Sequence, residues 1–294
     1  MKIGIYGQFY HPNAAEYIGQ LLEILDQKNI EVHIEEDFLG LIQENKTITK
    51  DYPRFKAFEE LDNSFELFFC IGGDGTILKS INYIRNLDIP IVGINTGRLG
   101  FLATIQKEQI SETIDEILNK NFTLSPRSVL SIATNPESED EIFSNIALNE
   151  IAVSRKNTTS MITVETWLDD QFLTSYWADG LIIATPTGST GYSLSCGGPV
   201  ITPDTDSLVI TPIAPHNLNA RPLVIKDHTV IKLKVSGREN SHLVSMDSRI
   251  ATLENETEII IKKAPYTVNF VELQQDSFLN TLRKKLLWGE DKRN

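Results

Sequence analysis

Hydrophobic and polar positions follow two different patterns along the chain, and the pattern changes near residue 126. Before that point, short apolar runs typical of strands alternate with stretches in which apolar residues recur every three or four positions. The strand-like runs cover residues 3–6, 30–34, 67–71 and 89–94, and the helix-like stretches cover 17–25, 77–87 and 108–120. This alternation predicts an α/β domain with an open, mainly parallel sheet.

After residue 126 the strand pattern dominates. Residues 160–175 alternate as a hairpin that turns at Asp169-Asp170. Further strand-like stretches cover residues 208–213, 229–235, 241–253 and 258–273. Many strands with few helices between them predict a mostly antiparallel β domain. Apolar residues at helical spacing after residue 277 predict a final amphipathic helix, so the expected organisation is 1–126, 127–272 and 273–294.

Composition narrows the classes of function. The 294 residues carry a net charge of −13, which disfavours general binding to nucleic acid or to an anionic membrane. Two cysteines exclude a disulfide framework, and the five histidines lack the spacing of a metal site. The sequence has neither an apolar run of membrane-spanning length nor a secretory signal pattern, so we expect a cytoplasmic protein.

The sharpest local signal is the turn Gly72-Gly73-Asp74-Gly75-Thr76, which follows the buried strand 67–71 and precedes a helix. Ligands of open α/β sheets bind at such carboxyl ends, and glycines at a helix start let backbone amides approach phosphate oxygens. A carboxylate repels phosphate, so Asp74 suggests contact with an attacking hydroxyl or a metal ion. Lys79 would offset charge one turn later. The same residues would also suit an ordinary turn in which Asp74 caps the helix.

Three further segments carry polar groups that suit a nucleotide. Residues 95–102 follow the next strand, with Asn95 and glycines for close approach and Phe101 for a ring face. Asn149-Glu150 interrupts a strand-like run, where the pair would contact an amide, a base edge or a ribose diol, or would serve a structural hydrogen bond. A short apolar strand at 179–184 runs into a predicted loop at 185–193 that is rich in hydroxyl groups and glycines. His216 and Cys196 lack partners for catalysis and are expected to be structural.

Taken in order, these segments resemble the NAD kinase family. The resemblance rests on residues 72–76, 95–102, 149–150, 179–199 and 212–223, and it covers the chain from about 67 to 250. The first segment alone is also similar to that of lipid kinases and phosphofructokinases, whereas residues 179–199 single out NAD kinases. The resemblance implies transfer of a phosphoryl group from ATP to the 2′-hydroxyl of the adenosine ribose of NAD, giving NADP and ADP. It also implies Mg²⁺ dependence, a homo-oligomer (dimer or tetramer) and a final helix that packs back on the first domain.

The resemblance also assigns roles to residues. Asp74 matches the proton acceptor, and four neighbours would lie by the phosphates: Gly72, Gly73, Gly75 and Thr76. The positions that match NAD contacts are Lys79, Asn149, Glu150, Asp179, Thr187, Gly188, Ser189, Thr190, Gly191, Tyr192, Ser193, Leu194 and Ser195. Ala214 is expected near the ligand.

The chain departs from the family at three places. Asp247-Ser248-Arg249 stands where members commonly carry Asp-Gly in a late hairpin, Trp177 stands where many have a basic residue, and Cys196 replaces a usual alanine. Two other functions remain open at this point, a lipid kinase and a dinucleotide sensor without turnover. The hydroxyl-rich segment argues against the first, and the intact Asp74 argues against the second.

Overall fold

Two structural units make up the chain, Met1–Pro126 with Val268–Asn294 and Arg127–Thr267. The structure, a computed structural model, describes residues 1–8, 15–45, 48, 50–97, 99–137, 145–157, 160–273 and 277–287. Among the described residues, none of the helices is long and apolar enough to cross a membrane.

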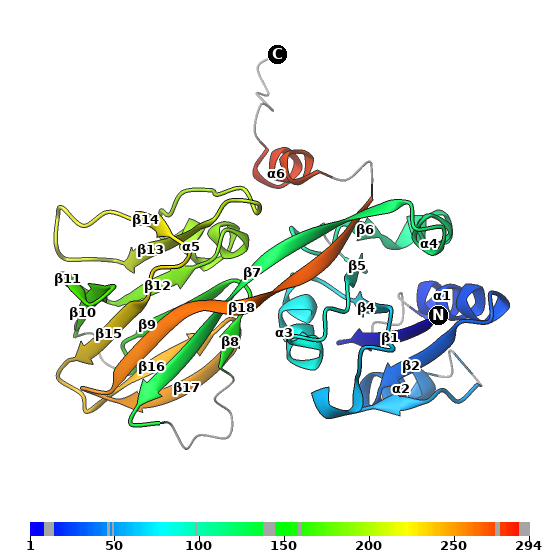
Figure 1. Cartoon of the computed structure of the whole chain (residues 1–294), viewed down its shortest axis with the longest axis horizontal. Coiled ribbons are helices and arrows are strands. Elements are labelled where there is room, and N and C mark those ends of the chain that lie inside the picture. The colour runs from blue at the N-terminus through cyan, green and yellow to red at the C-terminus, as the bar shows by residue number, and fades with distance from the viewer. Residues whose placement is uncertain are drawn as a thin grey trace, which may run out of the picture. The chain divides into compact units, whose positions relative to one another are not determined.

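The first unit contains a parallel sheet (Figure 1). Its strands are β1 (Lys2–Gly7), β2 (Glu31–Glu35), β3 (Arg54–Phe55), β4 (Leu67–Ile71), β5 (Ile91–Asn95) and β6 (Ile105–Gln106). They follow the order β5-β4-β1-β2-β3, every pair along this path is parallel, and β6 pairs with β5. The helical elements are α1 (Ala15–Gln27), α2 (Glu36–Glu44), η2 (Phe58–Glu60), α3 (Asp74–Ile84), η3 (Lys107–Gln109), α4 (Ile110–Leu118) and α6 (Phe278–Leu286).

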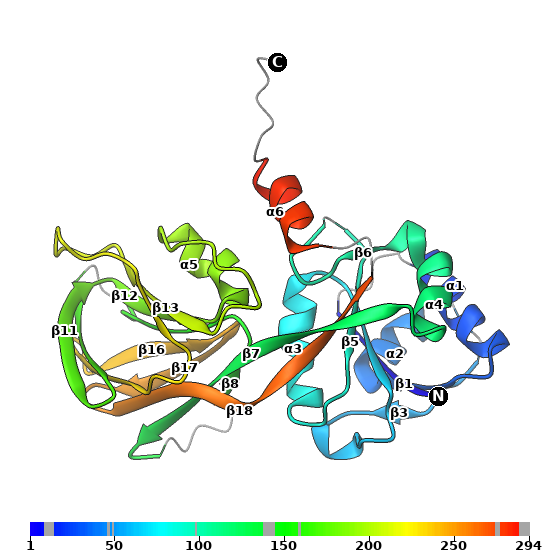
Figure 2. The same ribbon diagram turned by 45° about the horizontal axis from the view of Figure 1, so that its top comes forward.

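Helices cover both faces of this sheet, with α3 on one side and α1 and α4 on the other (Figure 2). The core on the second side joins alternate residues of β1, β2, β4 and β5 to the apolar stripes of α1, α2 and α4. On the opposite side, Ile77 of α3 lies against β5, where a Cβ added to Gly93 would be 2.8 Å from its Cδ1. Because both faces are buried, the central strands are apolar throughout, as the run 67–71 predicts.

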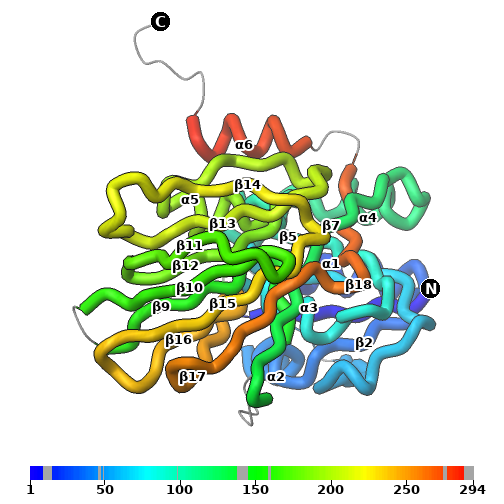
Figure 3. The backbone as a smooth tube through the Cα atoms, turned by 60° about the vertical axis from the view of Figure 1, so that its left-hand side comes forward, coloured from blue at the N-terminus to red at the C-terminus, as the bar shows by residue number. Residues whose placement is uncertain are grey.

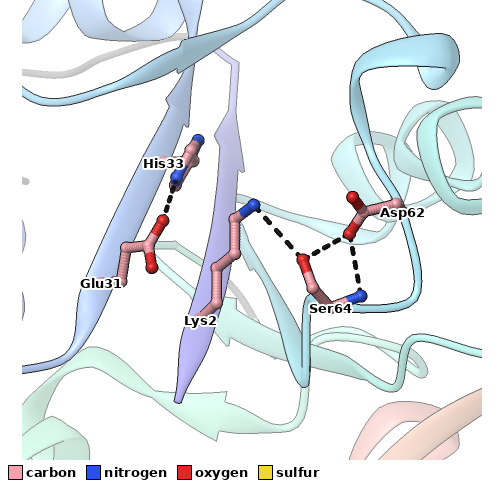
Figure 4. Close-up of polar contacts among 5 residues, drawn as sticks. All are labelled: Lys2, Glu31, His33, Asp62 and Ser64. Carbon is pink, nitrogen blue, oxygen red and sulfur yellow. Dashed lines mark hydrogen bonds and ion pairs between the residues drawn. The ribbon is translucent and has the colours of Figure 1, made fainter.

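A group of polar side chains forms hydrogen bonds near the amino ends of β1 and β2 (Figure 4). Lys2 donates to the Ser64 hydroxyl at 3.3 Å, Ser64 donates to Asp62, and His33 Nε2 lies 2.8 Å from Glu31. These groups lie at the sheet edge remote from the carboxyl ends, where the candidate site residues lie.

The second unit is built from antiparallel strands in two sheets (Figure 3). One sheet has the order β14-β13-β12-β9-β16-β17, and the strands of the other sheet within this unit include β11-β10-β15-β18. The strands are β7 (Phe122–Asn135), β8 (Ile146–Ala147), β9 (Glu150–Ser154), β10 (Ile162–Leu168), β11 (Gln171–Ala178), β12 (Gly180–Ala184), β13 (Ser207–Ile213), β14 (Leu223–Lys226), β15 (Ile231–Ser236), β16 (Ser241–Met246), β17 (Arg249–Glu254) and β18 (Glu258–Leu273). β7 and β18 begin or end in the first unit.

The core of the second unit lies between these two sheets. Residues of β12 alternate between this core and a smaller cluster on the opposite face that includes Ile201 and Cys196. Both faces of β12 are therefore buried, which positions the end of this strand and the segment after it.

The predicted fold class is confirmed: an α/β unit with a mainly parallel sheet and a mostly antiparallel β unit. The final helix is also present, and Phe278 at its start packs against Phe101, with ring centroids 6.2 Å apart. Two local expectations were wrong. Residues 241–253, which the apolar pattern predicts as strand throughout, form the hairpin β16–β17 that the family resemblance places there, because Asp247 adopts a left-handed turn at φ 52°. Residues 187–195 are not an open loop but the helical turns η4 (Thr187–Thr190) and α5 (Tyr192–Ser195).

Candidate active site

The glycine-rich turn joins β4 to α3 at the carboxyl end of the parallel sheet. A Cβ added to Gly72 would lie 2.2 Å from Thr76 Oγ1, so the tight turn itself requires this glycine. By contrast, a Cβ added to Gly73 or Gly75 would meet no atom of the described residues within 4 Å. Packing does not demand these two glycines, and the space over the start of α3 is open for a ligand.

Asp74, the first residue of α3, is held by three consecutive backbone amides. The N–H of Phe101 donates to Oδ2 at 2.8 Å, and those of Leu102 and Ala103 donate to Oδ1 at 3.0 and 3.1 Å. A Cβ added to Gly100 would lie 1.8 Å from Oδ1, so Gly100 is required for the carboxylate to fit. The loop after β5 therefore fixes the position of Asp74.

The other sequence-predicted residues of the first unit surround this arrangement. Asn95 is buried, and its Oδ1 accepts the N–H of Gly97 at 2.7 Å, so it shapes the loop that holds Asp74. Phe101 contributes its amide to Asp74 and its ring to the contact with α6. Lys79 lies half-buried on α3, and Arg98 of the 95–102 segment lies outside the described residues.

In the second unit, Asn149 and Glu150 lie at the start of β9, and a second aspartate holds them. The amides of Leu148, Asn149 and Glu150 donate to the carboxylate of Asp247 at 2.9, 2.8 and 3.1 Å. The arrangement repeats that around Asp74, with three consecutive amides on one carboxylate. Asp247 is the site residue that sequence reasoning did not assign; only its place in the family's late hairpin pointed to it.

The side chains of this pair present unused acceptors. Asn149 Oδ1 and Glu150 Oε2 are buried and have no hydrogen-bond partner within the part of the chain that the structure describes. Burial and the negative charge of Asp247 raise the pKa of Glu150 to about 8, against a small opposing effect of the Tyr192 amide. Burial also raises the pKa of Asp247, whereas its three N–H donors favour its ionised form. A buried polar atom without a partner costs free energy, so these two atoms indicate a place for ligand donors.

The raised pKa of Glu150 gives a pH dependence of stability. An unfolded chain loses this proton near the ordinary value of 4.5, while the folded protein keeps it up to about 8. The folded state therefore binds more protons in this window, and stability falls as pH rises through it, by up to about tenfold in the folding constant per pH unit. Chemical denaturation at pH 5 to 8 should show this fall in the wild type and a smaller fall in Glu150→Gln. An equal slope in both proteins would contradict the assignment.

The helical turns after β12 pack directly on Asn149 and Glu150. The Thr185 amide donates to the Asn149 carbonyl at 2.9 Å, and a Cβ on Gly188 would lie 2.1 Å from that oxygen. A Cβ on Gly191 would lie 3.1 Å from Glu150 Oε2. These glycines let the segment approach the pair closely.

The predicted residues 187–195 divide into inward and outward groups. The hydroxyl groups of Ser189 and Ser193 are buried and bond to Ile201 and Thr211, so they hold the segment in place. Thr187 Oγ1 is buried without a partner, which makes it a third unused polar atom. Among the remaining residues, Tyr192 and Ser195 are exposed, whereas Thr190, Gly191 and Leu194 are partly exposed.

Asp179 and Ala214 are brought together by the pairing of β12 and β13. The Asp179 amide donates to the Ile213 carbonyl at 3.0 Å, and Ala214 follows in a left-handed conformation at φ 44°. The Asp179 carboxylate pairs with Arg155 at 3.1 Å. His216 packs its ring against Trp177, with centroids 4.4 Å apart, which agrees with the structural role expected for it.

These features define a class: a nucleotide-dependent phosphotransferase with a phosphate-type turn in an α/β unit and unused polar acceptors in a β unit. The profile of the ATP-NAD kinase N-terminal domain matches residues 3–122, and that of the C-terminal domain matches residues 148–273. The chain belongs to the ATP-NAD kinase family.

Individual relatives agree with this membership. An NAD kinase of Christiangramia forsetii is 85% identical over the full length of both chains. The structure of a yeast NADH kinase in complex with NADH has a TM-score of 0.85 at 22% identity, covering 99% of this chain and 89% of that one. An Archaeoglobus fulgidus NAD kinase in complex with ATP has a TM-score of 0.74 at 24% identity, covering 98% and 99%. The two solved structures share the fold, and the full-length identity shows the activity of an NAD kinase.

Proposed function

We propose that this chain transfers the terminal phosphoryl group of ATP to the 2′-hydroxyl of the adenosine ribose of NAD, giving NADP and ADP. The observation that carries the proposal is the carboxylate of Asp74, which three amides fix at the start of α3 beside two glycines with open space. A phosphate-binding turn needs no carboxylate, whereas transfer to a hydroxyl group needs a group that orients it and accepts its proton.

The first unit would bind the phosphates. The exposed backbone at Gly73 and Gly75 and the amino end of α3 attract negative charge, with Gly72 and Thr76 shaping the turn. Lys79 lies on the same helix and would add positive charge. Because phosphoryl transfer has a loose transition state, such positioning and charge neutralisation supply most of the acceleration.

Asp74 would orient the attacking hydroxyl and accept its proton. Its oxygens already receive three N–H donors, which prevent the side chain from turning toward other partners. Each carboxylate oxygen accepts more than one hydrogen bond, so a substrate hydroxyl can still donate to it.

The second unit would bind NAD. The unused oxygen Asn149 Oδ1 suits a hydroxyl or amide donor of the dinucleotide, and Thr187 offers a hydroxyl group. The Glu150 carboxyl, whose raised pKa favours its protonated form at neutral pH, would offer both an O–H donor and an acceptor oxygen. Tyr192 is exposed enough to stack on a ring, while Asp179 and Ala214 lie together on the neighbouring strands. The other residues of 187–195 would contribute backbone groups or hold the segment.

A divalent metal ion would enter with the donor as Mg-ATP. Among the residues that the structure describes, no group of three or more His, Cys, Asp or Glu side chains is arranged to hold a metal ion. Mg²⁺ commonly binds through substrate phosphates together with one or two protein carboxylates, and this is the mode that we propose here. When bound, the ion neutralises charge on the phosphates.

The proposal is tested by incubating the protein with NAD, ATP and Mg²⁺ and measuring NADP with an NADP-specific dehydrogenase. Stoichiometric NADP and ADP are expected. Tight NAD binding without turnover would indicate a dinucleotide sensor instead. Absence of both would favour a lipid kinase, which phosphorylation of diacylglycerol would then detect.

Replacing Gly75 with alanine should separate stability from activity. Alanine at this helical position should raise the free energy of unfolding by up to about 1 kcal/mol, because nothing within 4 Å opposes it. Its methyl group should lower kcat/KM for ATP at least about tenfold by displacing the phosphates. Gly40→Ala on α2, which is equally free of contacts, is the control and should be stabilised without loss of activity. Full activity of Gly75→Ala would contradict the phosphate role.

The assembly and location stay predictions. We propose a cytoplasmic homo-oligomer, a dimer or tetramer, and the same two functional parts as expected from the sequence, a phosphate-binding first unit and an NAD-binding second unit. Sedimentation velocity at micromolar concentration would decide the oligomeric state, and a purely monomeric species would overturn that part.

A further inference from the structure

A cavity of about 400 Å³ lies in the first unit, and the residues of the glycine-rich turn are not among those that line it. It lies where β1 and β2 end, and the start of α2 and the end of α3 complete it. The lining residues used below are Gly7, Glu35, Asp37, Phe38, Leu41 and Tyr83. The volume is within the usual range of small-molecule sites.

The topology places this cavity at the same edge of the sheet as the glycine-rich turn. From β1 the chain proceeds to β2 on one side, and β4 later pairs with β1 on the other side, so β1 stands at the switch point of the sheet. Open α/β sheets bind ligands at the carboxyl ends beside such a point. Gly7 is in register with Ile71, the residue before Gly72. Two strand spacings, about 10 Å, separate the strand of the turn from the strand of Glu35.

Glu35 gives the cavity a polar group with unused capacity. The residue is 5% exposed, and its Oε2 accepts the Phe38 amide at 2.9 Å as the cap of α2. Its Oε1 receives the Tyr83 hydroxyl at a long distance of 3.4 Å. A buried carboxylate oxygen with one weak donor suits a ligand hydroxyl group.

The charged and apolar side chains that line the cavity determine which part of a nucleotide it can bind. The carboxylates of Glu35 and Asp37 repel phosphate, whereas the start of α3 attracts it. Phe38, Leu41 and Tyr83 provide aromatic and aliphatic surface for a base. A Cβ added to Gly7 would lie 2.4 Å from the Phe38 ring. A residue with a side chain at position 7 would therefore displace the Phe38 ring from its place in the cavity wall.

We propose that this cavity binds the adenosine of the phosphoryl donor, with Glu35 accepting a hydrogen bond from a hydroxyl group of its ribose. The inference rests on the proposed function, in which ATP is the donor. It adds a donor-nucleoside site that is separate from the residues assigned to the phosphates and to NAD.

The first test compares donors in one protein. The wild type should use ATP with a kcat/KM at least about tenfold above that of 2′-deoxy-ATP or of 3′-deoxy-ATP, because one of them lacks the hydroxyl group that meets Glu35. Glu35→Gln should reduce that preference to about threefold or less. Glu35 also caps α2, so the variant loses some stability, but the ratio of two donors does not depend on the amount of folded protein. A preference that Glu35→Gln leaves unchanged, or no preference in the wild type, would overturn the proposal.

The second test introduces a negative charge at Leu41, a partly exposed residue of the cavity lining. Leu41→Glu should raise the KM for ATP about tenfold and leave the KM for NAD within about twofold, because an added carboxylate faces the donor only. Leu279→Glu on α6, another exposed helical leucine outside the cavity, should change neither constant. An unchanged KM for ATP in a folded Leu41→Glu protein would overturn the inference while the NAD kinase assay of the wild type remained positive. A wild type inactive with ATP would instead overturn the proposed function.

Discussion

Asp74→Asn is expected to lower kcat for NADP formation by about a hundredfold or more, with the dissociation constant of NAD within about threefold of the wild type. The variant loses the group that accepts the proton of the attacking hydroxyl. It also turns an amide NH₂ group toward one of the backbone donors, since Oδ1 and Oδ2 both accept N–H groups. Steady-state turnover with a coupled assay and direct titration of NAD give the two quantities.

A neighbouring substitution separates position from chemistry. Gly100→Ala keeps the carboxylate but displaces it, because the new Cβ would lie 1.8 Å from Oδ1. It should lower kcat at least about tenfold. Gly97→Ala, in the same loop, is the control, because its nearest contact would be Asn95 Oδ1 at 4.0 Å. In the double variant Asp74→Asn/Gly100→Ala the two losses should not add, because both act through one carboxylate.

Near-normal turnover of Asp74→Asn would contradict the role of this residue. A rise in the NAD dissociation constant that accounts for the whole loss would contradict it as well, since Asp74 would then bind NAD and have no special part in the transfer step.

Much of the fold can be predicted from the spacing of apolar residues, because a strand that is buried on both faces is apolar at every position. The run 67–71 is apolar since both sides of β4 are covered, and the apolar stripe of α1 matches the core that it enters. The apolar pattern alone does not divide residues 241–253 into two strands, because Asp247 and Ser248 are not a typical pair of turn residues. The geometry of this hairpin depends on contacts with β9, which is distant in sequence. The sequence predicts a loop where the helical turns at 187–195 lie, because Ser, Thr and Gly have little helical preference. These turns are held by buried hydrogen bonds to residues 201 and 211, which the local sequence does not reveal.

Some residues of the candidate site can be predicted from the local sequence, and others cannot. The turn at 72–76 and the pair Asn149-Glu150 could be identified locally, because each interrupts an apolar strand pattern with polar residues. Gly100 and Asp247 act on groups that are 26 and 97 residues or more away in sequence, through a close approach in one case and three hydrogen bonds in the other. No spacing rule connects such positions, so only the three-dimensional contacts assign them.

Asp247→Asn is expected to raise the KM for NAD at least about tenfold while the KM for ATP stays within about twofold. Asp247 holds the amides of residues 148–150, so its loss should release the acceptors of Asn149 and Glu150 from their positions. Removal of its negative charge should also lower the pKa of Glu150, because that charge contributes to raising it to about 8. Any pH dependence of NAD binding due to Glu150 should therefore move to lower pH in the variant.

Asp169→Asn is the matched control for this substitution. Asp169 also lies in a hairpin turn with positive φ, 48° against 52° for Asp247, and its carboxylate also accepts a backbone amide, that of Val230. The substitution should cost some stability but leave the KM for NAD and the pH profile unchanged. Equal effects of the two substitutions on NAD binding would mean that Asp247 only stabilises its hairpin. A selective rise in the KM for NAD, together with the pH shift, would make Asp247 a positioning residue of the NAD site, since a purely structural role would move neither quantity.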